Sequence, residues 1–141
     1  MNGKRFRFLG LTVWLLGWAL VIALGTAAGQ QAPPTENKGM KAPVVASLDL
    51  GPEIDGMQGR QLRMRVITLE PGGVIAVHPH KDRPSVVHLL QGTWTELREG
   101  GYVKEYREGD SWAEGKATTH WAENRGAKPA VAVVVDIFRQ P

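Results

Sequence analysis

The chain has 141 residues, of which 17 are Lys or Arg and 14 are Asp or Glu, so its formal net charge is +3. It contains no cysteine, which excludes disulfides, thiolate metal sites, thiol catalysis and a lipidated cysteine anchor. Three basic residues lie within the first seven positions, and without them 14 basic residues face 14 acidic ones. A neutral chain offers no electrostatic basis for binding nucleic acid.

Residues 1–28 have the order of segments that is typical of a secretory signal peptide. Basic residues at positions 4, 5 and 7 precede an apolar run over residues 8–24, and small residues follow as far as Ala28. The alternative is an uncleaved anchor, because about 21 residues are close to the length that spans a bilayer. Both interpretations predict an exported domain, periplasmic or secreted, and only the anchor would attach it to a membrane.

The chain after the signal segment is expected to consist of a linker and one all-β domain. Residues 29–43 are polar and rich in Gly and Pro, which predicts a flexible linker. Residues 44–141 contain short runs rich in β-branched and aromatic residues, and Gly100–Gly101 predicts a tight hairpin. Many short strands without helical periodicity indicate a sandwich or a barrel. The expected strands are 44–50, 61–69, 74–78, 86–92, 93–98, 102–106, 111–115, 119–124 and 130–138.

Three histidines are the most informative residues of this domain. His78 and His80 are two positions apart on an expected strand, so their side chains point to the same face. With His120, from a separate expected strand, they would offer three imidazoles to a divalent transition metal: Fe, Mn, Zn, Ni or Cu. The alternative is that they are packed or surface residues. By strand alternation His88 points to the opposite face, where we expect it to pack or form a hydrogen bond.

The spacing around His78 and His80 resembles the first motif of the cupin superfamily. That motif is a glycine, five residues, His-X-His, three or four residues, a glutamate, six residues and a glycine. The two histidines and Gly92 fit this frame, and Gly72 provides the first glycine at the five-residue spacing. Ser85 stands at the position of the glutamate, so a metal bound as in cupins would rest on the three histidines.

The stretch from Gly109 to Asn124 resembles the second cupin motif at matching spacing, and His120 is its histidine. Gly115 and Ala117 replace the proline and glycine of that motif. The resemblance covers about residues 60–138. It implies a small double-stranded β-helix, or jelly-roll barrel, of two facing sheets, with the histidines pointing into its open mouth. It also implies possible homodimers, and the apolar run over residues 131–137 fits either an interface strand or one buried on both sides.

Two acidic residues are candidates for a catalytic role. Glu114, at an expected turn, can act as a base or as a partner of a ligand histidine, and Asp82, in a loop, can replace the missing carboxylate. For each, the simpler interpretation is a solvated turn residue. The resulting prediction is an exported cupin-domain protein whose three-histidine metal site binds a small organic ligand. The alternatives are a metal-dependent enzyme, dioxygenase-like or hydrolase-like, and a structural or binding barrel without metal.

Overall fold

The computed structural model describes residues 32–139, so the predicted signal segment lies outside the described residues. Apart from one 3-10 turn at Glu99–Gly101, these residues contain no helix, and hence none long and apolar enough to cross a membrane. The prediction of an all-β domain is confirmed. The strands are β1 Lys38–Lys41, β2 Val44–Asp49, β3 Arg60–Pro79, β4 Ser85–Gln91, β5 Thr93–Arg98, β6 Tyr102–Arg107, β7 Ser111–Glu114, β8 Thr119–Glu123 and β9 Ala130–Arg139.

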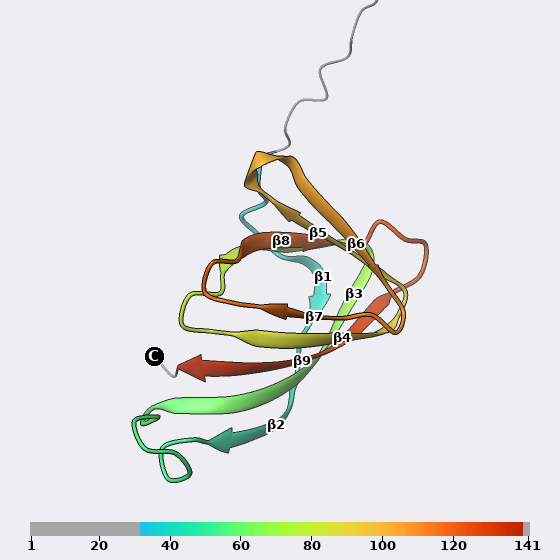
Figure 1. Cartoon of the computed structure of the whole chain (residues 1–141). Helices are drawn as coiled ribbons and strands as arrows, with labels where there is room; N and C mark the ends of the chain where they lie inside the picture. The colour runs from blue at the N-terminus through green and yellow to red at the C-terminus, as the bar shows by residue number, and fades with distance from the viewer. Residues whose placement is uncertain (1–31, 140–141) are drawn as a thin grey trace, which may run out of the picture.

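All nine strands belong to one hydrogen-bonded sheet that curls into a nearly closed barrel (Figure 1). The strand order is β6-β5-β8-β3-β9-β4-β7, and β1 and β2 both pair with β3. Residues 60–69 of β3 pair with β9, whereas residues 74–79 pair with β8. A bend at residues 70–73 therefore carries β3 from one wall of the barrel to the other. The two strands expected at 61–69 and 74–78 are one bent strand.

The predicted linker, residues 29–43, is part of the barrel over most of its described length. β1 pairs with β3 on both sides of the bend. Upstream of β1, the N–H of Val77 donates to the carbonyl of Pro34 and that of Ala76 donates to the side-chain oxygen of Asn37, both at 2.8 Å. The linker prediction is wrong for residues 34–41. Polar composition does not reveal that a segment forms backbone hydrogen bonds with the unpaired edge of a distant strand.

The hairpin predicted at Gly100–Gly101 is confirmed between β5 and β6. Arg98 pairs with Tyr102, which leaves a three-residue loop. Both glycines have positive φ, 78° and 83°, a conformation that side chains with a Cβ rarely adopt. The glycine pair thus specifies the register of β5 against β6.

The barrel interior is filled by the residues that alternate inward along each strand. On β3, β4 and β9 these residues are mostly aliphatic, and on β5 and β6 they include aromatic rings. Several charged side chains share this inward parity, among them Arg63, Arg65, Glu96, Glu114 and Asp136. The apolar core consists of Ile67, Leu69, Ile75, Val87, Leu89, Trp94, Tyr106, Ala122, Ala130, Ala132 and Val134.

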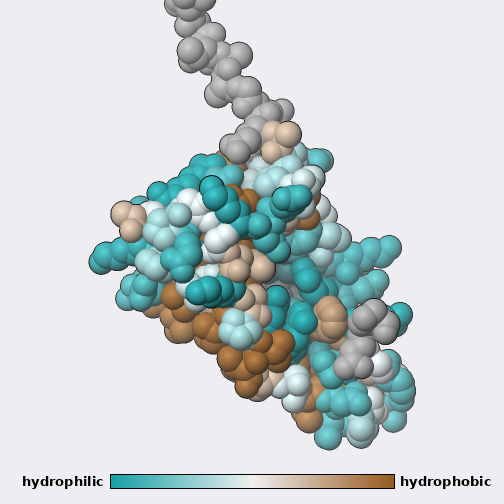
Figure 2. Space-filling view, turned by 180° about the vertical axis from the view of Figure 1, so that it is seen from behind, coloured by the Kyte–Doolittle hydropathy of each residue, from teal (hydrophilic) through white to brown (hydrophobic). Residues whose placement is uncertain are grey.

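The outer face of β9 is apolar, while both its edges are paired, with β3 and β4. Val131, Val133 and Val135 point outward and are half-buried. Apolar side chains gather on one area of the surface in Figure 2. A homodimer stays a prediction, which gel filtration of residues 29–141 tests. The exposed large apolar side chains on the neighbouring strands β2, β3 and β4 are Val44, Val45, Leu48, Leu62, Met64, Val86 and Leu90.

Asn124, the last residue of the second motif, ties the bend of β3 to the loop that precedes β9. Its buried amide donates to the carbonyls of Leu69 and Lys128, each at 2.8 Å, and accepts from the N–H of Gly126 at 2.9 Å. We expect Asn124→Ala to lower the free energy of unfolding by about 2–4 kcal/mol, because it leaves buried backbone groups unpaired. Urea denaturation measures this loss. Gln91→Ala removes an exposed amide that bonds Pro129, and should cost less than about 1 kcal/mol.

Candidate metal centre

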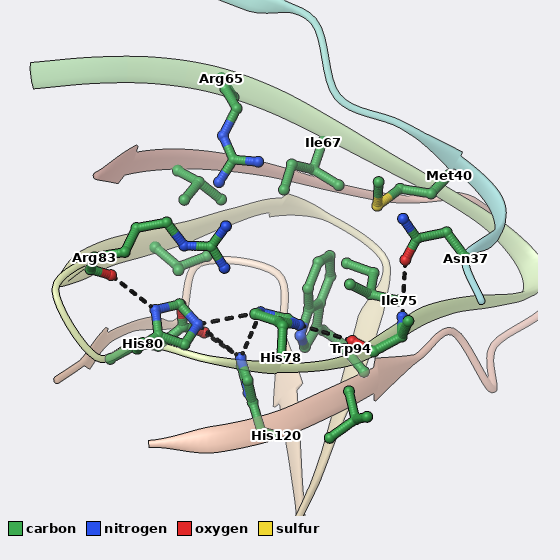
Figure 3. A pocket seen from close by; sticks show the side chains of 16 residues that line it. Asn37, Met40, Arg65, Ile67, Ile75, His78, His80, Arg83, Trp94 and His120 are labelled. Atoms are coloured by element: carbon green, nitrogen blue, oxygen red, sulfur yellow. Dashed lines mark hydrogen bonds and ion pairs between the residues drawn. The ribbon is translucent and has the colours of Figure 1, made fainter. Parts of the chain in front are cut away.

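Three histidines from two neighbouring strands meet at one point inside the barrel. His78 lies near the end of β3 and is the register partner of His120 on β8, while His80 follows directly after β3. The Nε2 atoms are 3.2 Å apart for His78 and His80, 3.0 Å for His80 and His120, and 3.1 Å for His78 and His120. Spacing of two along a strand thus brings the first pair together, as predicted, and strand pairing adds the third (Figure 3).

The other ring nitrogen of each histidine faces an oxygen, which fixes the imidazole tautomers. Nδ1 of His78 lies 2.8 Å from the carbonyl of Ala76, and Nδ1 of His80 lies 3.1 Å from the carbonyl of Arg83. A carbonyl only accepts, so each Nδ1 carries the proton and each Nε2 presents a lone pair. Lone pairs that face each other at this distance repel unless a cation lies between them. The arrangement therefore suits a metal ion.

The nitrogen spacing also fits the bond lengths of a transition metal. Metal–imidazole bonds of about 2.1 Å place adjacent ligands about 3.0 Å apart in octahedral geometry and about 3.4 Å apart in tetrahedral geometry. The observed separations of 3.0–3.2 Å are closer to the octahedral value. Among the described residues, these three histidines bring their ligand atoms close enough together that they could hold a metal ion. On one face of a metal they would leave further positions open for other ligands.

Glu114 brings a carboxylate to the histidines from a neighbouring strand. It ends β7 and is the register partner of Ser85, which starts β4. Its Oε2 lies 3.2 Å from Nε2 of His80 and its Oε1 lies 3.6 Å from Nε2 of His120. The hydroxyl of Ser85 donates to Oε2, and Nε1 of Trp112 donates to Oε1 at 3.0 Å. Glu114 is buried, so the interpretation of a solvated turn residue is wrong.

The other candidate acid, Asp82, does not reach this cluster. It lies in the exposed loop between β3 and β4 with a φ of 61°, and its carbonyl accepts a hydrogen bond from Arg60. It lines a surface hollow that His80 also borders, and it does not line the cavity above the imidazoles. His88 is exposed on the outer face of β4, and its Nδ1 lies 2.8 Å from the hydroxyl of Ser111, as the alternation argument predicts.

Glu96 on β5 contacts the ring nitrogen of His120 that faces away from the other histidines. The sequence did not predict this role. Its Oε1 lies 3.3 Å from Nδ1 of His120 and accepts from Arg98 at 2.7 Å, while its Oε2 accepts from Tyr106 at 3.0 Å. Burial acts to raise the pKa of Glu96, but its contacts with His120, Arg98 and Tyr106 outweigh burial and hold this pKa at about 2. A charged carboxylate behind a ligand imidazole is the usual outer partner of a metal-bound histidine.

A cavity of about 290 Å³ opens above the imidazoles. Its volume matches the lower end of the range for small-molecule sites. Asn37 and Met40 contribute to it, so the segment predicted as a linker forms part of its wall. The other walls are largely apolar, and they are formed by Ile67, Ile75, Ala76, Val77, Val87, Trp94, Ala122 and Val134.

The buried imidazoles make the stability of the metal-free protein depend on pH. Burial, with the neighbouring charges of His120, His80 and Arg83, lowers the pKa of His78 to about 4, and burial also lowers the pKa of His80. An unfolded imidazole titrates near 6.5, so the unfolded chain takes up these protons first as the pH falls. We therefore expect the urea concentration at the unfolding midpoint of the metal-free protein to decrease as the pH is lowered from 6.5 to 4. A midpoint that is constant across this window would contradict the expectation, and His78→Gln should reduce the slope.

The barrel, with histidines converging in its mouth, places the protein among the double-stranded β-helix proteins. The family model of the Cupin_2 cupin domain matches residues 65–136, so the chain belongs to the cupin superfamily. The predicted family is confirmed, and so is the predicted jelly-roll barrel. No curated protein matches the chain.

Solved structures share the fold at low sequence identity. An uncharacterized conserved protein with a double-stranded β-helix domain from Klebsiella pneumoniae is 21% identical, with a TM-score of 0.57, over 74% of this chain and 81% of that one. KdgF from Halomonas sp. is 19% identical, with a TM-score of 0.56, over 72% and 82%. The polyketide cyclase RemF from Streptomyces resistomycificus is 16% identical, with a TM-score of 0.59, over 77% and 72%. At these identities the likeness concerns the fold alone.

Proposed function

We propose that this protein binds one divalent transition metal through His78, His80, His120 and Glu114, and holds a small organic ligand above that metal. The observation that carries the proposal is the convergence of three Nε2 atoms within 3.0–3.2 Å, each with its lone pair free. Glu114 would restore the carboxylate that Ser85 does not provide, because its oxygens stand 3.2 and 3.6 Å from two of these nitrogens. Fe, Mn, Zn, Ni and Cu all suit such ligands.

Elemental analysis of the protein purified from its native compartment tests the metal. One equivalent of a transition metal per chain is expected, and His80→Ala should abolish it while the barrel stays folded. Titration of the chelator-treated protein with Mn, Fe(II), Ni, Cu and Zn then ranks the metals. A chain that takes up none of these metals, or whose metal affinity is unchanged in His80→Ala, would remove the metal proposal and leave a structural or binding barrel.

Metal-dependent catalysis is the second candidate function, and the position of Glu114 favours it. A buried carboxylate within hydrogen-bonding distance of the metal ligands can accept or donate a proton next to a bound substrate. A dioxygenase-like reaction is tested by anaerobic loading with Fe(II), followed by oxygen uptake across a panel of small organic acids. A hydrolase-like reaction is tested with zinc-loaded protein and esters of the same acids. Failure of both assays with metal-loaded protein would leave binding without turnover.

Export is proposed on the order of segments in residues 1–28 alone. Cleavage after Ala28 predicts that the mature protein begins at Gly29 and is recovered from the periplasm or the medium. N-terminal sequencing of that material checks the cleavage. An intact N-terminus in the membrane fraction would support the uncleaved anchor.

A further inference from the structure

The cavity above the histidines carries an excess of positive charge. Two arginines, Arg65 and Arg83, line it, and of the described acids only Glu114 does. In Figure 3 the guanidinium of Arg65 points into the cavity from the wall opposite His120, and the guanidinium of Arg83 lies between that wall and the imidazoles. Glu114 faces the histidines, so the two guanidinium groups lack an acid of their own inside the cavity. The excess exists before any metal is added.

Arg83 is the freer of these two cations. It lies in the loop that joins β3 to β4, where its carbonyl faces Nδ1 of His80 and so fixes the residue beside the metal ligands. Its side chain is half-buried and forms no ion pair within residues 32–139. A guanidinium that lines an apolar cavity without a carboxylate is well placed to receive an anion in a two-pronged contact.

Arg65 is held by Asp136 but is not neutralised by it. The same carboxylate binds Arg63 at 2.8 Å and Arg65 at 2.9 Å, so one negative charge serves two cations. Burial lowers the pKa of Arg65, and the positive charges of Arg63 and Arg83 lower it further. The Nε–H of Arg65 is buried and has no partner among the described residues.

A guanidinium that lines an apolar cavity without a carboxylate of its own is costly, and an anion in the cavity would relieve that cost. Two such cations favour a ligand that is anionic and accepts several hydrogen bonds. The apolar remainder of the wall, formed by Ile67, Ile75, Val87 and Val134 among others, calls for a hydrophobic body. Both demands must be met within about 290 Å³, which admits only a small molecule.

We infer that the ligand of this cavity is a small organic acid whose carboxylate pairs with Arg83 and Arg65, while its apolar body fills the space above the histidines. The inference rests on the proposed function for the identity of the pocket, but the arginine contact itself needs no metal. It names the ligand class that the proposed function leaves open.

Benzoate and benzamide test the inference, because they have the same shape and differ in charge. Isothermal titration into the full mature chain, chelator-treated and metal-loaded, gives both affinities. We expect benzoate to bind more tightly than benzamide, and Arg83→Gln to weaken benzoate about 10- to 100-fold, as for a lost charge-assisted hydrogen bond. The matched control is Lys81→Gln, which removes the same charge from an exposed position of the same loop, and it should change the affinity less than about twofold.

The outcomes separate this inference from the proposed function. Equal binding of benzoate and benzamide to the unmodified chain, or equal losses in Arg83→Gln and Lys81→Gln, would overturn the inference, and the first comparison needs no variant. Metal affinity is measured in parallel by competition with a chelator, and Arg83→Gln should not weaken it. An Arg83-dependent preference for benzoate in a chain that takes up no metal would support the inference and refute the proposed function. Metal uptake without a preference for benzoate would support the proposed metal site and refute the inference.

Discussion

Glu114→Gln is expected to weaken binding of a divalent metal by at least about 100-fold, and Ser85→Glu in the same chain is expected to restore most of it. Glutamine keeps the shape of the side chain but removes the charge that faces His80 and His120 at 3.2 and 3.6 Å. Ser85 is the strand partner of Glu114, so a glutamate at position 85 brings its carboxylate to the same histidines from the adjacent strand. Chelator competition with Mn or Zn measures the three affinities.

Asp82→Asn is the matched control for this experiment. It removes one negative charge from the exposed loop next to the site, and asparagine tolerates the positive φ found at that position. Its metal affinity should stay within about threefold of that of the unmodified chain. A double variant as weak as Glu114→Gln, with a normal melting temperature, would show that Glu114 does not stand in for the missing glutamate. A loss in Asp82→Asn as large as that in Glu114→Gln would point to the loop instead.

Glu96→Gln is expected to lower the free energy of unfolding by about 2–4 kcal/mol at pH 7, and to weaken metal binding by about 10- to 100-fold. The carboxylate is fully buried and accepts from Arg98 and Tyr106, so its neutral replacement leaves a guanidinium poorly compensated. It also removes the negative charge 3.3 Å from Nδ1 of His120, which orients that ring toward the proposed metal. Urea unfolding and chelator competition measure the two effects separately.

The pH dependence gives Glu96→Gln a signature of its own. The pKa of Glu96 is held at about 2 in the folded protein, below the value of an unfolded glutamate. Its contribution to stability is therefore complete above about pH 4.5 and is lost as the pH falls toward 2. The variant should lack this part of the acid sensitivity. Glu105→Gln breaks an exposed pair with Arg107 on the neighbouring strand, and should cost less than about 1 kcal/mol at any pH.

The sequence alone predicts the parts of the site that depend on local spacing. Alternation along a strand places His78 and His80 on one face, and it places His88 on the other. Alternation also predicts that two charged side chains point inward. Arg65 has the parity of the buried Ile67, and Glu96 has the parity of the buried Trp94. A charged residue at an inward position of a strand indicates a buried partner or a ligand. Alternation could therefore have predicted both residues as part of the site.

The remaining parts depend on which strands lie side by side, and a single sequence does not contain that information. Glu114 and Ser85 are 29 positions apart, and only the register of β7 against β4 makes them neighbours. Polar composition in the same way predicts a mobile segment upstream of residue 44, because it does not show that β3 has a free edge to pair with. The direction of the Arg83 side chain depends on a loop in which Asp82 has positive φ.

The position of β9 has a consequence for the order in which the chain folds. β9 is the ninth strand in sequence, yet it lies between β3 and β4 and pairs with both along most of its length. During synthesis neither β3 nor β4 can complete its hydrogen bonds on that side until residues 130–139 have emerged. Such long-range pairing makes folding slow, and it keeps the growing chain open until late. In the export proposed for this chain, such late pairing would favour passage through a membrane in extended form.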